Sequence, residues 1–283
     1  MKRSKLLFTA LFALGGAVAQ ADITGTVKLD GKAPEMPEIN MKSVADCAKK
    51  HKDPVYEETI IAGDKGELAN VVIALKPEDP SALGGTVPDQ TAVLDQQGCM
   101  YHPHVIAMMV GQKLSIKNDD EFQHNVHSLA QTNPSFNFSQ PNKDDGKPVD
   151  PPKAAETYRV KCDVHPWMNA WVVVLDHPFF AVSGEDGKFE IKGNVPDGDY
   201  TITAWHEKLG TQEGKVTVKD GKGEVNFTFK AEGATGPAEN PGTPKLASAK
   251  PEVKEVSNTK AMSCCSGGNK SDAKEDEQVA ATK

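Results

Sequence analysis

The chain has 283 residues, with 32 basic and 40 acidic side chains and a net charge of −8 at neutral pH. An acidic balance argues against binding to nucleic acid or to anionic lipid. The 24 glycines and 19 prolines favour an all-β fold with many turns. Walker loops, dinucleotide glycine motifs, Gly-x-Ser-x-Gly elbows and His-Glu-x-x-His are absent from the sequence, so we expect no enzymatic activity of its own.

The first 21 residues have the features of an export signal. Three basic residues precede an apolar run over 6–18, and a small-x-small site, Ala19-Gln-Ala21, follows. This pattern predicts a signal peptide over 1–21, although an uncleaved anchor is the alternative. Cleavage leaves 29 basic against 40 acidic residues, a net charge of −11. The signal predicts that the mature chain is periplasmic or secreted, and no later stretch is long enough to span a bilayer.

Short runs with strand character follow one another from residue 22 to residue 230. Asp-Gly turns between alternating runs, as at Asp30-Gly31, are typical of hairpins. The expected strands cover 23–29, 70–75, 112–117, 157–162, 170–175, 179–183, 188–192, 196–205, 214–219 and 224–229. From residue 231 onward there is no aromatic side chain, and the composition predicts a disordered tail over 231–283.

The segment Cys162-Asp-Val-His165-Pro-Trp-Met168 carries the most specific chemistry of the sequence, together with His124 in an upstream run. The four side chains supply one thiolate, two imidazoles and one thioether. This donor set suits copper that cycles between two oxidation states. Three donors lie in one seven-residue loop between two expected strands, and alternation along 157–162 points Cys162 inward.

Each of these residues also has a plain structural interpretation. A free cysteine is usually a small core residue, and Met168 beside a tryptophan can be ordinary packing. A His-Asn pair is more often a hydrogen-bonded turn. Zinc is the rival metal, but a thioether position is characteristic of copper sites.

The loop resembles that of amicyanin, a cupredoxin with Cys-x2-His-x2-Met spacing, and His124-Asn-Val-His127 is similar to amicyanin as well. The resemblance covers residues 91–176 and implies a Greek-key β-sandwich. It implies that His124, Cys162 and His165 form a trigonal plane around copper, with Met168 as the weak axial ligand. Asn125 would pin the two ligand segments together.

The flanking segments have a resemblance of their own. Ile23-Thr-Gly-Thr-Val, Ser183-Gly-Glu-Asp-Gly-Lys-Phe189 and Pro196-Asp-Gly-Asp-Tyr200 look like parts of a carboxypeptidase-regulatory, transthyretin-like β-sandwich. This likeness implies that residues 22–80 and 177–230 form one sandwich into which the copper domain is inserted. Two independent consecutive domains are the alternative.

All five cysteines follow the signal segment, and a metal-bound Cys162 leaves an even number. We expect a structural disulfide between Cys47 and Cys99, with two separately buried thiols as the alternative. The adjacent pair Cys264-Cys265 is open to several interpretations. It would capture Cu(I), link two chains, or have no function.

The other histidines are expected to have structural roles. His127 lies an odd number of residues from His124, so it points to the opposite face of a strand. His102 and His104 share a face and offer a second metal site, but a turn with satisfied imidazoles is the favoured interpretation. His206 is read as structural, and Met108 as core filler.

The predicted function is one-electron transfer by an exported copper protein. We expect His165 to expose its ring edge in an apolar patch with Pro166 and Trp167, where a cytochrome, dehydrogenase or oxidase docks. The acidic run 119–121 would steer a partner with a basic docking surface. A copper carrier or storage protein is the second hypothesis, and a saccharide- or partner-binding module is the third.

Overall fold

A computed structural model describes residues 22–77, 83–193 and 195–233 of the chain. The predicted signal peptide lies outside the described residues, as does the predicted tail except for its first three residues. Those three form a 3-10 turn, η2 (Ala231–Gly233). Within the described residues, none of the helices is long or apolar enough to cross a membrane.

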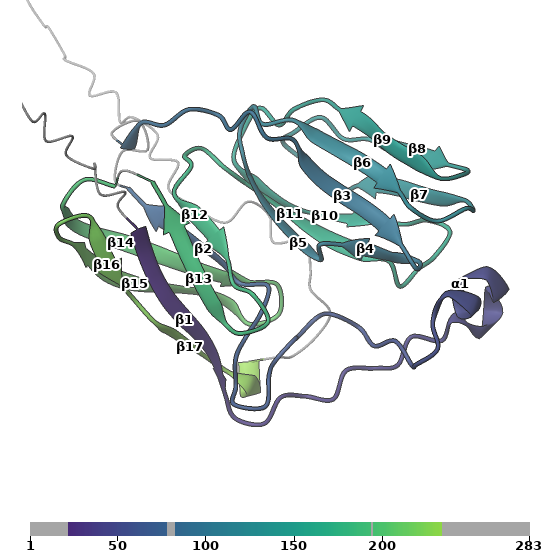
Figure 1. The fold of residues 1–283 in the computed structure, drawn as a ribbon, viewed down its shortest axis with the longest axis horizontal. Helices are drawn as coiled ribbons and strands as arrows, with labels where there is room; N and C mark the ends of the chain where they lie inside the picture. Colours follow the sequence, from purple (N-terminus) through teal and green to yellow (C-terminus); the bar gives the residue numbers. More distant parts are fainter. Residues whose placement is uncertain (1–21, 78–82, 194, 234–283) are drawn as a thin grey trace, which may run out of the picture. The chain divides into compact units, whose positions relative to one another are not determined.

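The first and last parts of the described chain pair with each other in two sheets (Figure 1). In one sheet, β1 pairs antiparallel with β13 and parallel with β16 and β17; in the other, the order is β12-β2-β14-β15. The strands are β1 (Asp22–Asp30), β2 (Val72–Lys76), β12 (Phe180–Val182), β13 (Lys188–Lys192), β14 (Gly198–His206), β15 (Gly210–Val218), β16 (Lys222–Glu224) and β17 (Phe227–Lys230). These pairings join strands from residues 22–76 to strands from residues 180–230.

The residues between these strands form two further sheets, with strand orders β5-β11-β10-β7-β8 and β4-β3-β6-β9. The strands are β3 (Ala92–Gln97), β4 (Met100–His102), β5 (Val105–Met109), β6 (Leu114–Asn118), β7 (His124–Ser128), β8 (Asn137–Gln140), β9 (Asp144–Val149), β10 (Glu156–Lys161) and β11 (Asn169–Leu175). A turn, η1 (Met41–Ser43), and a short helix, α1 (Ala45–Lys50), precede them in the chain. The prediction of an all-β fold is confirmed by this arrangement.

Alternation of apolar and polar residues explains which strands have one buried face. In β13, the buried Phe189 and Ile191 alternate with exposed charged residues. The strand β6 alternates in the same way, with Leu114 and Ile116 buried. Such strands place one face on a core and the other in water, which is why the sequence predicts them well.

The strands β2 and β11 are buried on both faces and connect the two pairs of sheets. In β11, Val172 and Val174 pack into the core of the sheets formed by β3 to β11, while Trp171 and Val173 face a separate apolar cluster. In β2, Ala74 joins this same cluster from the flanking sheets. A continuous apolar run, as over 170–175, is therefore required where a strand has a core on either side.

A buried polar group accompanies this shared cluster. Glu207 accepts a hydrogen bond from the indole of Trp171 (Nε1 to Oε2, 2.8 Å) and pairs through its other oxygen with His104 Nε2. A second carboxylate, that of Glu58, lies 3.7 Å from His104 Nδ1. Burial alone would lower the pKa of His104, but the hydrogen bond and charge of Glu207 and the charge of Glu58 raise it.

We predict that this ion pair makes the stability of the protein depend on pH. Because the pKa of His104 is raised in the folded state, its stabilisation is complete below about pH 6.5 and is lost as the pH rises through the folded-state pKa. His104→Gln should lower the free energy of unfolding by about 1–3 kcal/mol at pH 6, and by less at pH 9. Urea denaturation at several pH values measures both effects.

The matched control is His102→Gln, which changes an exposed histidine two residues away. Its free energy of unfolding should stay within about 0.5 kcal/mol of the parent at every pH. If the loss caused by His104→Gln were the same at pH 6 and pH 9, the histidine would not be charged in its pair with Glu207.

Candidate metal centre

The ends of two paired strands position the predicted ligand loop. Lys161, the last residue of β10, pairs with Asn169, the first residue of β11, so the loop 162–168 starts and ends at one point. Inside the loop, Cys162 N donates to Met168 O (3.1 Å) and Met168 N donates to His165 O (3.0 Å). These bonds fix the backbone of the three predicted ligands in the loop.

Cys162 follows directly after β10 and points inward, on the same face as the buried Tyr158 and Val160. Its sulfur accepts hydrogen bonds from the backbone N–H groups of Asn125 (3.4 Å) and His165 (3.3 Å). Burial alone would raise the pKa of this thiol. Hydrogen bonds from both imidazoles and from these two backbone N–H groups lower the pKa to about 6. The site therefore favours a thiolate at neutral pH.

The two predicted histidine ligands meet beside this sulfur. His124 is the first residue of β7 and is fully buried, and its Nδ1 lies 3.0 Å from His165 Nδ1. The distance from His165 Nδ1 to Cys162 Sγ is 3.7 Å. One nitrogen of each ring and the sulfur lie within 4.8 Å of one another. The structure thus brings together three of the four predicted ligands, which come from segments that are far apart in the sequence.

The fourth predicted ligand, Met168, is fully buried in the same apolar cluster as Cys162. Its backbone contacts with Cys162 and His165 keep it at the base of the ligand loop. Among the described residues, His124, Cys162 and His165, which could hold a metal ion together, are likewise buried. Met168 is therefore buried beside the three other predicted ligands.

Asn125 connects the strand of His124 to the ligand loop. Its side-chain oxygen accepts from Asp163 N (3.1 Å), and its amide nitrogen donates to Asn137 Oδ1 (2.7 Å) and Phe138 O (3.2 Å). The amide therefore joins β7, β8 and the loop. This is the pinning role that the sequence resemblance implies for this residue.

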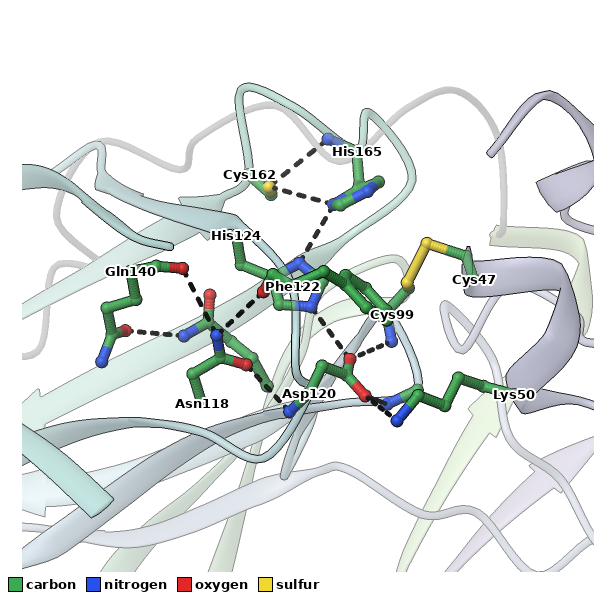
Figure 2. A network of polar contacts seen from close by, with 12 residues as sticks. Cys47, Lys50, Cys99, Asn118, Asp120, Phe122, His124, Gln140, Cys162 and His165 are labelled. Atoms are coloured by element: carbon green, nitrogen blue, oxygen red, sulfur yellow. Dashed lines mark hydrogen bonds and ion pairs between the residues drawn. A yellow bond between two sulfur atoms is a disulfide. The ribbon is translucent and has the colours of Figure 1, made fainter. Parts of the chain in front are cut away.

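Asp120 holds the far side of the His124 ring and was missed as a site residue. Its Oδ2 accepts from His124 Nε2 at 2.9 Å, and its two oxygens also accept from the backbone N–H groups of Gly98 and Cys99. Burial alone would raise the pKa of Asp120, but the hydrogen bond from His124 and those from Cys99 and Gly98 lower it. With Nε2 bonded to a carboxylate, Nδ1 is left to face Cys162 and His165 (Figure 2).

A disulfide lies against this centre. The structure joins Cys47 of α1 to Cys99, the residue directly before β4. Sulfur atoms of both cysteines and a ring nitrogen of His165 lie within 4.8 Å of one another. The indole of Trp167 donates to Cys99 O at 3.0 Å, which fixes the ligand loop to the same segment.

This contact corrects one expectation. His165 does not expose its ring edge, since only 2% of the residue is accessible. The disulfide and the apolar residues around it, including Met41 and Ile39, pack into the cluster that contains the ligand loop. Sequence alone gave no indication of this cover, because residues 39–50 are separated from the loop by more than 100 positions.

The acidic run 119–121 is also different from its expected role. Asp119 pairs with Lys117 and Lys143, and Asp120 is buried, so two of the three charges are used inside the fold. Glu121 alone of the three is exposed. The run therefore offers little free negative charge for steering a partner.

The remaining histidines have structural partners. His127 is half-buried and bonds Asp163 (Nδ1 to Oδ2, 3.0 Å), away from the metal centre. His102 is exposed whereas His104 is buried beside Glu207, so these two do not face a common site. His206 Nδ1 accepts from the backbone N–H of Lys208 (3.1 Å). Cys264 and Cys265 lie outside the described residues.

No protein-family model matches the sequence, and no curated protein matches it. Solved structures that are similar to part of the chain include a reduced variant of amicyanin, with 24% identity over 36% of this chain and 98% of that chain (TM-score 0.27). Amicyanin from Paracoccus versutus has 20% identity over 36% of this chain and 97% of its own (TM-score 0.28). A purple cupredoxin from Nitrosopumilus maritimus has 22% identity over 30% of this chain and 99% of its own (TM-score 0.24).

We predict that removing the charge of Asp120 destabilises the fold. Asp120→Asn places an amide N–H against one of the donors that now meet the carboxylate. It should therefore lower the free energy of unfolding by about 1.5–3 kcal/mol. Urea denaturation measures this loss, and nitrogen NMR of the His124 ring reports the weakened bond at Nε2.

Asp119→Asn is the matched control, because it changes the neighbouring carboxylate, whose partners are lysines at the surface. Asp119→Asn should lower the free energy of unfolding by less than about 1 kcal/mol. Equal losses for the two variants would show that the hydrogen bonds of Asp120 do not support the centre.

Proposed function

We propose that this protein is an exported blue-copper protein that carries single electrons between redox partners. The observation that supports this function most directly is the convergence of the Cys162 sulfur and of one nitrogen each from His124 and His165 within 4.8 Å. Met168 would supply the fourth donor to the metal, because it is buried in the same cluster and follows His165 in the same closed loop.

The donor set fits copper better than zinc. A structural zinc site takes four ligands, mostly from cysteine, histidine and carboxylates. The carboxylate of Asp120, which contacts His124, is already engaged by His124 Nε2 and two backbone N–H groups. The remaining candidate is the thioether of Met168, a ligand that suits copper. Copper bound in such a set gains and loses one electron between its two oxidation states.

The surrounding residues hold the ligands in place without the metal. Asn125 ties the strand of His124 to the loop, and two backbone N–H groups point at the sulfur of Cys162. Hydrogen bonds to the outer atoms of ligands orient them and tune the metal. A centre whose ligands are fixed in this way changes little when an electron arrives or leaves, which favours rapid transfer.

Location and partner belong to the same proposal. The signal-like segment 1–21 and the acidic mature chain, with a net charge of −11 from 29 basic and 40 acidic residues, support export and a redox partner with a basic docking surface. Since Asp119 and Asp120 are engaged inside the fold, the attraction would come from acidic residues elsewhere on the surface.

The experiment is copper loading of the mature chain and of its Cys162→Ala variant. We expect an intense blue or green thiolate-to-copper band in the parent, bleached by reductant and absent from the variant, because the sulfur supplies the electron of that transition. Visible absorption and electron-spin resonance measure it.

His127→Gln is the control for this experiment, since it removes a nearby histidine whose ring bonds Asp163. Its spectrum should match that of the parent. A pale parent protein with ordinary copper signals that persist in Cys162→Ala would overturn the proposal.

Copper delivery is the second candidate function, and the Cys264-Cys265 pair and the additional histidines of the sequence favour it. The two functions differ in how tightly copper is held. For an electron carrier, we expect a Cu(I) chelator such as bicinchoninate to remove less than about a tenth of the copper while small oxidants and reductants cycle the colour many times. Rapid removal of the metal with poor redox cycling would instead favour copper delivery or copper storage.

A further inference from the structure

The disulfide between Cys47 and Cys99 touches the metal centre on two sides. Its sulfur atoms and a ring nitrogen of His165 lie within 4.8 Å of one another. The sulfur of Cys99, a ring nitrogen of His124 and an oxygen of Asp120 also lie within 4.8 Å of one another. Both cysteines are fully buried. The disulfide therefore lies beside both imidazoles of the candidate metal centre.

Reduction would turn this pair into metal donors. Two electrons and two protons break the S–S bond and give two thiols, while a dithiol reductant is oxidised to its own disulfide. Thiolates are soft ligands that favour Cu(I), and imidazole completes such a set. The two thiols would stand beside His165, so the three donors that Cu(I) needs are already grouped in the folded chain.

The surrounding contacts would keep the two thiols together after the bond is broken. On one side, Cys99 N donates to Asp120 and Cys99 O accepts from the Trp167 indole. On the side of Cys47, the end of α1 contacts the segment 98–120 independently of the disulfide. Lys50 Nζ lies 3.3 Å from Asp120 Oδ1, and His51 Nε2 lies 2.6 Å from Gly98 O. The segment of Cys47 therefore has two further anchors near Cys99.

We propose that Cys47, Cys99 and His165 form a second copper(I) site that is closed when the cysteines are oxidised and opened by a dithiol reductant. Binding of Cu(I) releases the two thiol protons. The two sites share His165, so they compete for one copper ion. Reduction of the disulfide thus shifts the chain from holding a redox-active copper towards holding Cu(I). This inference goes beyond electron transfer and does not require the thiolate of Cys162.

The test uses the full mature chain with Cys162→Ala, Cys264→Ser and Cys265→Ser, so that Cys47 and Cys99 are its remaining cysteines. The chain is reduced with a phosphine, desalted under argon and titrated with Cu(I) against bicinchoninate. We expect one Cu(I) per reduced chain, bound roughly 100-fold more tightly than by the oxidised chain. Adding His165→Gln should weaken binding by about 10-fold, and X-ray absorption should show sulfur ligands.

The control adds Cys47→Ser and Cys99→Ser to the same background, and reductant should then have no effect on Cu(I) binding. Equal affinity in the oxidised and reduced chains would overturn the proposal. So would tight binding that is unaffected by His165→Gln, or loss of the β-type circular dichroism on reduction, since each shows that two free thiols act without the folded site. None of these results bears on the blue band of the parent chain, which tests the electron-transfer function separately.

Discussion

The buried carboxylate of Asp120 is the interaction on which the candidate metal centre depends. It accepts hydrogen bonds from His124 and from the backbone of Gly98 and Cys99, and it pairs with Lys50 of α1. A buried carboxylate is stable only when its oxygens accept hydrogen bonds or pair with a cation. Loss of any of these partners would therefore destabilise the fold. The same group thus orients one imidazole, positions one half of the disulfide and attaches the segment that covers the other imidazole.

The double burial of β2 and β11 gives that centre a rigid support. The ligand loop starts and ends at the pairing of β10 with β11, and β11 packs on a core on either side. A strand with no free face has little room to shift, because close-packed interiors transmit small displacements. The position of Met168 just before this strand is therefore fixed by apolar packing, whereas His124 and Asp120 are fixed by hydrogen bonds.

Much of the fold was predictable because its information is local. Alternation identified strands such as β6 and β13, and the expected strand over 188–192 has the bounds of β13 itself. The ligand loop was predictable for the same reason, since three donors occur within seven residues. The strands β8 and β9 were missed because their residues are mostly polar and only partly buried, so they leave no apolar period to detect.

The parts of the centre that sequence reasoning missed all depend on tertiary contacts, which form only in the folded chain. Asp120 was interpreted as part of an exposed acidic run, although it lies four residues before His124 and is almost fully buried. The helix α1 is six residues long and has no strong apolar period, so nothing local marks it as a cover for the ligand loop. The pairing of Cys47 with Cys99 was expected from the cysteine count, but its contact with His165 was not.

The cover over His165 changes how an electron would enter or leave the proposed copper. With the imidazole edge closed, the exposed part of the ligand loop is formed by Asp163, Val164 and Pro166. Asp163 pairs with Lys161 and His127, so its charge is compensated, and Val164 is 47% exposed.

A partner would therefore meet a nearly neutral, apolar surface directly over the backbone that joins Cys162 to His165. Desolvating such a surface costs little, whereas a charged rim acts mainly on the rate of encounter. For the proposed electron transfer, the acidic charge of the chain would attract a partner, and this surface would bring it within reach of the sulfur ligand.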